Sequence, residues 1–333
     1  MLFSLPLALA ERGFVPEPLL RWGIRRLLAQ RLREEAGRNP GAIDGALSQG
    51  PVALVPEAAN RQHYEVPPAF FELVLGTRLK YSAAYWPDGT ETLDQAEEQM
   101  LELTAARAQL ADGQRVLELG CGWGSLSLWM ARRYPNSRIT AVSNSAPQRG
   151  FIAARAPTNL QVLTADMNTF AIDGRFDRVV SVEMFEHMRN WRELMRRIAG
   201  WLDPGGKLFV HVFCHRRHAY LFETAGAGNW LGRHFFTGGL MPALDLLPRF
   251  QEPLVLEKTW EVGGEHYART AEVWARTLAA RRDAILPVLR ATYGEAAPRW
   301  LERWRVFFLA CAELFAYRGG AEWLVGHYRL RKP

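Results

Sequence analysis

The chain has 333 residues, of which 48% are hydrophobic and 23% are charged, as in an ordinary folded globular protein. This composition excludes collagen-like, low-complexity and disordered classes, and no apolar run approaches the ~18 residues of a membrane-spanning helix. Lysine and arginine number 41 against 35 acidic residues, a net charge of +6 that a solvated surface explains without a nucleic acid partner.

The N-terminal part of the chain predicts helices. The opening MLFSLPLALA is apolar but has no basic residues before it, so it predicts helical turns rather than a signal peptide. Within residues 19–35 the apolar side chains share one helical face, away from the arginines: Leu20, Ile24, Leu27 and Leu28. Such a helix either packs on its own core, which we favour, or lies on an anionic membrane.

Two further helices are predicted before residue 111. Pro67 and Pro68 open the first of them, because proline is favoured in the first turn of a helix. The second covers residues 92–110 and begins with Thr92 and Gln95, which match a capping box. We therefore expect residues 1–110 to form a helical N-terminal cover.

From residue 111 the chain alternates between short apolar strands and helices. Strands are predicted over 115–119, 138–144, 160–166, 176–183 and 207–213. The alternation predicts an α/β fold built on a doubly wound, Rossmann-like parallel sheet. Residues 111–333 would form this core, and the aromatic and glycine-rich insertion 216–250 would form the side of the site that holds an acceptor.

The cysteines and histidines predict neither disulfides nor a metal site. The three cysteines have no CxxC spacing, which favours a reducing compartment, so we expect a cytoplasmic protein. The cluster HVFCHRRH (211–218) lacks a second ligand pair at zinc-finger spacing, so no metal is expected.

A glycine turn, ELGCGWG (118–124), follows the first strand at the edge where α/β proteins bind ligands. A dinucleotide site would continue GxGxxG and place an acid at the end of the second strand, but that end reads VSNS. With Glu118 before it, the turn matches the first motif of class I S-adenosylmethionine (SAM) methyltransferases. Glu118 would hold the ammonium of SAM and Asp166 the adenine amine, although both could be ordinary polar strand ends.

Several longer segments resemble one superfamily, that of the cyclopropane-fatty-acid synthases. They are LKYSAAYW (79–86), SVEMFEHM (181–188) and the pair Asn144 and Gln148. Within this superfamily the chain is most similar to the coclaurine-type (benzylisoquinoline alkaloid) N-methyltransferases, from about Tyr64 to the C-terminus. The resemblance implies a class I SAM-methyltransferase fold and a SAM site, with S-adenosylhomocysteine (SAH) as product, formed by Tyr81, Ser82, Glu118, Gly120, Gly122, Asn144, Gln148, Asp166, Met167 and Val182.

The resemblance also separates two branches of chemistry. The lipid branch has YSCGYW, where this chain has Ala83 in YSAAYW; it has Ile in place of Phe213 and Gly in place of Glu183. Its bicarbonate contacts correspond here to Glu186, His211 and Tyr267. The implied catalytic residues are Glu183, Glu186, His187 and Cys311, although Cys311 also reads as a small core residue. The implied substrate-binding residues are Tyr64, Glu65, His211, Phe213, Trp230, Phe235 and Tyr267.

An acid suits an amine substrate, which arrives mostly protonated and must lose a proton before its lone pair can react. Glu183 would attract the ammonium and His187 would take the proton. We therefore expect a SAM-dependent N-methyltransferase acting on a small aromatic, tetrahydroisoquinoline-like amine. The alternatives are a cyclopropane-fatty-acyl-phospholipid synthase or other lipid methyltransferase, and a non-enzymatic SAM-binding protein. A homodimer is compatible with the sequence.

Overall fold

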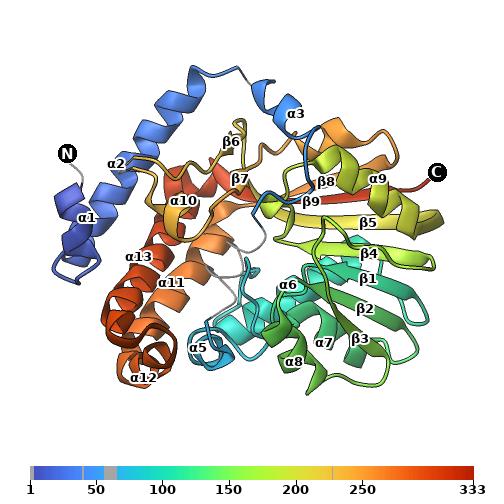
Figure 1. The fold of residues 1–333 in the computed structure, drawn as a ribbon, viewed down its shortest axis with the longest axis horizontal. Helices are drawn as coiled ribbons and strands as arrows, with labels where there is room; N and C mark the ends of the chain where they lie inside the picture. The colour runs from blue at the N-terminus through green and yellow to red at the C-terminus, as the bar shows by residue number, and fades with distance from the viewer. Residues whose placement is uncertain (1–3, 40, 56–65, 227) are drawn as a thin grey trace.

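The computed structural model describes residues 4–39, 41–55, 66–226 and 228–333. It contains a seven-stranded sheet in the order β3-β2-β1-β4-β5-β9-β8 (Figure 1). These strands are β1 (Arg115–Leu119), β2 (Arg138–Ser143), β3 (Leu160–Thr164), β4 (Phe176–Val182), β5 (Leu202–His215), β8 (Val255–Val262) and β9 (Trp323–Arg331). Strands β1 to β5 are parallel, and β9 is antiparallel to both β5 and β8. The predicted doubly wound α/β fold is confirmed.

The helices include those predicted before the sheet. Thr92 and Gln95 form the expected capping box at the start of α6. The α-helices are α1 (Ser4–Ala10), α2 (Glu17–Ala36), α3 (Ala42–Ala46), α5 (Pro68–Val74), α6 (Leu93–Ala108), α7 (Ser125–Arg133), α8 (Ala146–Ala153), α9 (Trp191–Trp201), α10 (Trp230–His234), α11 (Gly264–Ala280), α12 (Arg282–Tyr293) and α13 (Ala297–Ala316). None of these helices in the described ranges is long and apolar enough to cross a membrane.

Short elements complete the chain. The insertion 216–250 contains α10 and a separate two-stranded sheet, β6 (Tyr220–Leu221) with β7 (Leu240–Met241). The short 3-10 turns are η2 (Phe185–His187), η3 (Leu247–Phe250), η4 (Gly294–Ala296) and η5 (Tyr317–Gly320).

Both faces of the sheet are covered, as the apolar strands require. Successive side chains of a strand point to opposite faces. In β1, Val116 accordingly joins one hydrophobic cluster with residues of α6 and α7, and Leu117 and Leu119 join another with residues of α9. The continuous apolar run of β1 is therefore explained by two buried faces rather than by one.

The strand order places a ligand site at one edge. Strand β1 pairs with β2 on one side and with β4 on the other, so the strand order reverses at β1. Ligands of open α/β sheets bind beyond the carboxyl ends of the strands at such a switch point. The glycine turn after β1 lies at this position.

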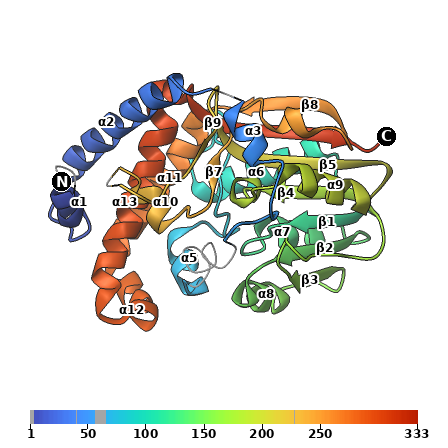
Figure 2. The same cartoon turned by 45° about the horizontal axis from the view of Figure 1, so that its top comes forward.

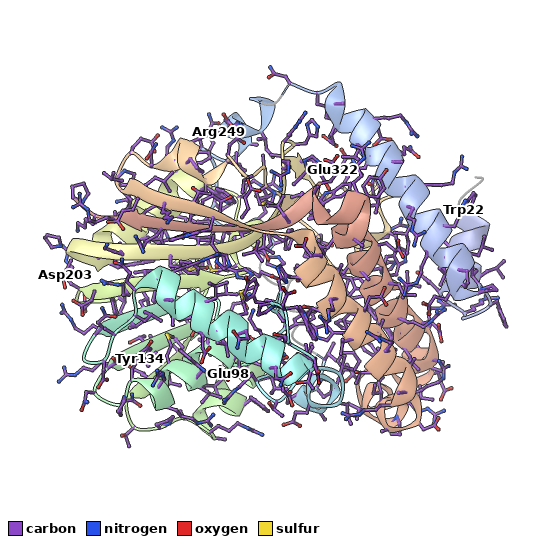
Figure 3. The ribbon with its side chains drawn as sticks, turned by 180° about the vertical axis from the view of Figure 1, so that it is seen from behind. Trp22, Glu98, Tyr134, Asp203, Arg249 and Glu322 are labelled. Atoms are coloured by element: carbon purple, nitrogen blue, oxygen red, sulfur yellow. The ribbon has the colours of Figure 1, made fainter. Side chains whose placement is uncertain are left out.

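A helical layer of α11, α12 and α13 extends the molecule at one end, and α2 lies along α13 (Figures 1 and 2). Side chains of Leu20, Ile24 and Leu28 pack against the main hydrophobic cluster, which supports core docking of this basic helix. Leu27 is instead exposed, and Trp22 projects outward from α2 (Figure 3). The division of the chain at residue 110 stays a prediction.

Candidate active site

The glycine turn adopts conformations that side chains other than glycine rarely accept. Gly120, Gly122 and Gly124 have φ angles of 81°, 53° and 84°. A Cβ atom at Gly120 would lie 2.8 Å from Cβ of Met184, so packing alone demands glycine there. At Gly122 a Cβ would meet no heavy atom of the described residues within 4 Å, which leaves this position facing open space.

That space belongs to two adjoining cavities at the edge of the sheet. Both cavities are open to solvent, and their volumes are about 730 Å³ and 590 Å³ when that open space is included. Both are lined by Gly120, Gly122, Gln148 and Glu183. All ten residues predicted to bind the cofactor line one or both of them: Tyr81, Ser82, Glu118, Gly120, Gly122, Asn144, Gln148, Asp166, Met167 and Val182. The fold therefore brings this set together, and the contact of each residue with SAM stays a prediction.

The polar groups around the cavities fit SAM. Gln148 is buried, and its Oε1 accepts a hydrogen bond from Ser143 Oγ at 2.6 Å. Its Nε2 has no hydrogen-bond partner within the described part of the chain, so a buried donor is available for a ligand hydroxyl. Burial raises the pKa of Glu118 to about 7, against a hydrogen bond from Ser127 that lowers it. An ammonium beside Glu118 would favour its charged form.

Glu183 follows β4 with an unusual backbone, at a φ of 47°. A left-handed conformation costs energy for a residue with a side chain and is often found at functional sites. Its Oε1 accepts a hydrogen bond from Ala83 N at 3.0 Å and lies 3.2 Å from His211 Nε2. Its Oε2 accepts a bond from the hydroxyl of Tyr267 at 2.7 Å. The carboxylate is thus held from three directions at the cavity wall.

The next two predicted catalytic residues lie on η2 and differ in their surroundings. His187 lines the first cavity together with Glu183, and its ring stacks on Phe236 at 5.9 Å between centroids. Glu186 is buried, and its Oε2 has no hydrogen-bond partner among the described residues. Burial, followed by the charge of Glu183, raises the pKa of Glu186 well above its usual range. Of the two acids, Glu186 is therefore the one whose surroundings more strongly disfavour the charged form, because Lys80, Ala83 and Tyr267 act against the effect of burial at Glu183.

Lys80 is a site residue that the sequence reasoning missed. Its side chain is buried, its Nζ donates to Ser82 Oγ, and it lines the second cavity with Glu183. Burial lowers its pKa to about 8, against the charges of Glu183 and the buried Glu97, which raise it. A lysine inside the mostly apolar segment LKYSAAYW was the available signal, because lysines are rarely fully buried without a partner.

The predicted substrate-binding residues separate into two groups. The first group lies near Glu183 and His187. His211 and Tyr267 contact the Glu183 carboxylate. The Phe213 ring lies 5.7 Å from the ring of Phe236, which stacks on His187. Trp230 and Phe235 form the second group, and both are buried.

The contacts of the second group lead to the turn between α1 and α2 and to α13. Trp230 Nε1 donates to Glu11 Oε1 at 2.9 Å, and the Phe235 ring stacks on Phe307 at 4.1 Å. Their role at an acceptor site stays a prediction, as does that of Tyr64 and Glu65, which lie outside the described residues. Cys311 is buried, and burial followed by the charge of Glu183 raises its thiol pKa, so it provides no thiolate.

A segment of the N-terminal cover also lines the first cavity. Ala53 and Val55 face it, and Asn168 anchors Ala53 by accepting from its backbone N at 2.9 Å and donating to its backbone O at 3.0 Å. Asn168 follows Asp166 and Met167, so the cover closes over the predicted adenine end. Nothing in the hydrophobic pattern of residues 51–55 indicated this contact.

Comparison with known proteins gives one family. A family model described as mycolic acid cyclopropane synthetase matches residues 55–320. The chain is 36% identical to (S)-coclaurine N-methyltransferase of Thalictrum flavum subsp. glaucum, over 97% of this chain and 94% of that protein. It is 29% identical to cyclopropane-fatty-acyl-phospholipid synthase of Escherichia coli (strain K12), over 80% of this chain and 66% of that protein.

The fold gives the same result. A crystal structure of coclaurine N-methyltransferase bound to N-methylheliamine and SAH matches with a TM-score of 0.91 and 33% identity, covering 99% of this chain and 98% of that chain. The resemblance stated from the sequence and the choice of SAM as cofactor are confirmed. The chain belongs to the mycolic acid cyclopropane synthetase family, and it is a SAM-dependent methyltransferase.

Proposed function

We propose that this protein methylates the nitrogen of a small aromatic amine of the tetrahydroisoquinoline type. The observation that carries the proposal is the position of Glu183 and His187, which line the same cavity as six of the predicted SAM residues, while Glu183 also lines the second cavity with the other four. The similarity over nearly the full chain to a protein named (S)-coclaurine N-methyltransferase supports this acceptor class.

SAM held by the predicted cofactor residues would supply a sulfonium-bound methyl group; its transfer to the nitrogen lone pair would leave the electrons of the broken S–C bond on sulfur, giving SAH. The protein must first present a neutral amine, so one proton has to leave the nitrogen. The carboxylate of Glu183 attracts the arriving ammonium and orients its N–H bonds. The imidazole of His187 receives the proton, and Phe236 stacked against it holds the ring in place.

The surroundings of Glu183 favour this reaction over lipid cyclopropanation. The resemblance assigns bicarbonate contacts in the lipid branch to positions that include Ala83, His211 and Tyr267. Here all three make contacts with the Glu183 carboxylate. The protein thus carries its own carboxylate where these groups converge, which leaves no reason to recruit a free anion.

The test supplies methyl-labelled SAM with either a tetrahydroisoquinoline amine or vesicles of unsaturated phospholipid. We expect label in the amine and none in the lipid. Label in the lipid alone would refute the proposal and favour the lipid methyltransferase alternative. Replacement of Glu183 by glutamine provides the matched control for nonspecific methyl transfer.

A further inference from the structure

The Glu183 carboxylate is one end of a chain of side chains that crosses the sheet. His211 Nε2 lies 3.2 Å from Glu183 Oε1, and His211 Nδ1 lies 2.8 Å from His327 Nε2. His327 Nδ1 in turn lies 2.7 Å from Nη1 of Arg107 on α6. His211 on β5 and His327 on β9 are paired directly in the antiparallel ladder, and both rings are fully buried.

The direction of every hydrogen bond in this chain follows from its last member. A guanidinium only donates hydrogen bonds, so Nδ1 of His327 must accept one and cannot carry a proton. The proton of neutral His327 is then on Nε2, which donates to Nδ1 of His211. His211 in turn carries its proton on Nε2 and donates to Glu183. Arg107 therefore fixes the tautomers of both rings.

The surroundings of His211 and His327 favour the neutral form of both rings. Burial, followed by the charge of Lys80, lowers the pKa of His211 well below its usual value. Burial also lowers that of His327, and the neighbouring His211, Arg107 and Lys80 act in the same direction. A charged ring would also place a proton on a nitrogen that the geometry uses as an acceptor.

The other groups that face Glu183 come from four elements. Ala83 N donates to it from the segment before α6, and Tyr267 donates from α11. The charge of Lys80 acts from the same segment as Ala83, while Glu186 on η2 and Cys311 on α13 interact electrostatically with Glu183. Burial raises the pKa of Glu183, and Lys80, Ala83 and Tyr267 act against it. Its charged form therefore depends on donors, and the chain ending at Arg107 supplies one more.

We propose that Arg107 and His327 are positioning residues that act through His211 to hold Glu183 as the charged carboxylate that receives the substrate ammonium. This assignment rests on the proposed function. Neither residue is among those that line the two cavities, so both are placed outside the catalytic set. Because a guanidinium cannot accept a proton, the chain is not an exit for the proton of the amine. That proton leaves through His187 instead.

The test compares Arg107→Met, which removes the donor, with Arg107→Lys, which keeps a cation with only donors. The matched control is Arg329→Met on β9. Arg329 lies against the same Trp260 ring as Arg107, 5.4 Å from its centroid against 5.2 Å, and makes no described hydrogen bond to either histidine. Its Nη1 donates to the backbone oxygen of Arg107 at 3.1 Å, so this control reports the effect of losing support for α6 while the Arg107 donor is kept. Full-length protein labelled with ¹⁵N-histidine reports the tautomers by long-range ¹H–¹⁵N NMR, with His211 and His327 assigned by single substitution.

We expect both rings to show the neutral Nε2–H tautomer from pH 6 to 8. Arg107→Met should shift these signals, while Arg107→Lys and the control should keep them. In amine methylation, Arg107→Met should move the acid limb of kcat/KM upward by about one pH unit, because losing one hydrogen bond raises the pKa of Glu183. The affinity for SAH should stay within about twofold, since the cofactor residues are untouched.

Unchanged tautomers in Arg107→Met would overturn the proposal, as would an unchanged pH profile in a protein that methylates amines. A loss of SAH binding in step with thermal stability would also overturn it, because it would indicate a purely structural role. If no amine is methylated by the wild-type protein, the proposed function fails, and the NMR measurement still decides whether Arg107 sets the tautomers.

Discussion

Replacing Glu183 with glutamine should remove a charge while leaving the local structure intact. The amide oxygen can take the place of Oε1 and accept from Ala83 N and His211 Nε2. The amide NH₂ then faces the hydroxyl of Tyr267, which can rotate from donor to acceptor. Because each hydrogen bond keeps a partner, we expect the free energy of unfolding to change by less than about 1 kcal/mol.

The effect on catalysis should be much larger. A hydrogen bond to a charged group contributes about 1.5–3 kcal/mol, against roughly 1 kcal/mol for a neutral one. Losing the full charged interaction with the substrate ammonium therefore lowers kcat/KM by about 10- to 150-fold, at 1.36 kcal/mol per factor of ten. The loss should appear in KM for the amine as well as in kcat, since Glu183 also attracts the ammonium before the reaction.

The assay measures initial rates of label transfer from SAM to the amine, SAH affinity by calorimetry and thermal stability of the same preparations. We expect SAH affinity within about twofold of the wild type, because Glu183 only borders the predicted cofactor set. Activity within twofold of the wild type would refute the assignment of Glu183 to the ammonium. An equal loss of SAH affinity would place Glu183 in the cofactor site instead.

Three further outcomes are expected. His187→Ala should lower kcat by roughly 10²–10⁴-fold with SAH affinity retained, as for a lost general base; a parallel loss of SAH binding would contradict this. Gly122→Ala places a Cβ in the open cavity at a φ of 53°; it should weaken SAH binding at least about tenfold while destabilising the fold by about 1–2 kcal/mol, as calorimetry and thermal unfolding would report. Burial raises the pKa of Glu313, but hydrogen bonds from Arg25 and Arg21 outweigh burial and hold the pKa below 4.5. The stabilisation that Glu313 gives to α2 should therefore be complete above pH 4.5 and lost as the pH falls. This pH-dependent loss should be absent from the acid-unfolding curve of Glu313→Gln.

The sheet was predictable where its signal was local. Strands β1 to β5 were recognised because each contains a short apolar run, and burial on both faces explains why the runs of β1 and β4 are continuous. The start of β5 was predicted wrongly, because the strand begins at Leu202 and includes the DPGG segment before the predicted range 207–213. The pairing of His211 with His327 was not predictable, because it joins strands 116 positions apart through an antiparallel register. No periodicity within either segment encodes that register.

The site was predictable where a sequence motif specifies the backbone conformation. The glycine turn requires positive φ angles, and such positions leave a clear pattern in the sequence. The aromatic residues of the insertion gave no comparable guide. Trp230 and Phe235 pack toward Glu11 and Phe307, while the adjacent Phe236 stacks on His187. A large ring is buried wherever most apolar area is covered, and composition cannot distinguish a pocket wall from a core contact.

The proposed choice of acceptor rests on residues that are distant in sequence and adjacent in space. Ala83 and Glu183 are two of the three positions at which the resemblance separates this chain from the lipid branch, and they are 100 positions apart, yet Ala83 N donates to Glu183 Oε1. A larger side chain at position 83 would disturb the donor that orients the carboxylate, and a residue without a carboxylate at 183 would leave Tyr267 and His211 without a common partner. The two differences are therefore coupled. A double-mutant cycle with Ala83→Cys and Glu183→Gly should give a non-additive loss of amine methylation, and additive losses would show that the two positions act independently.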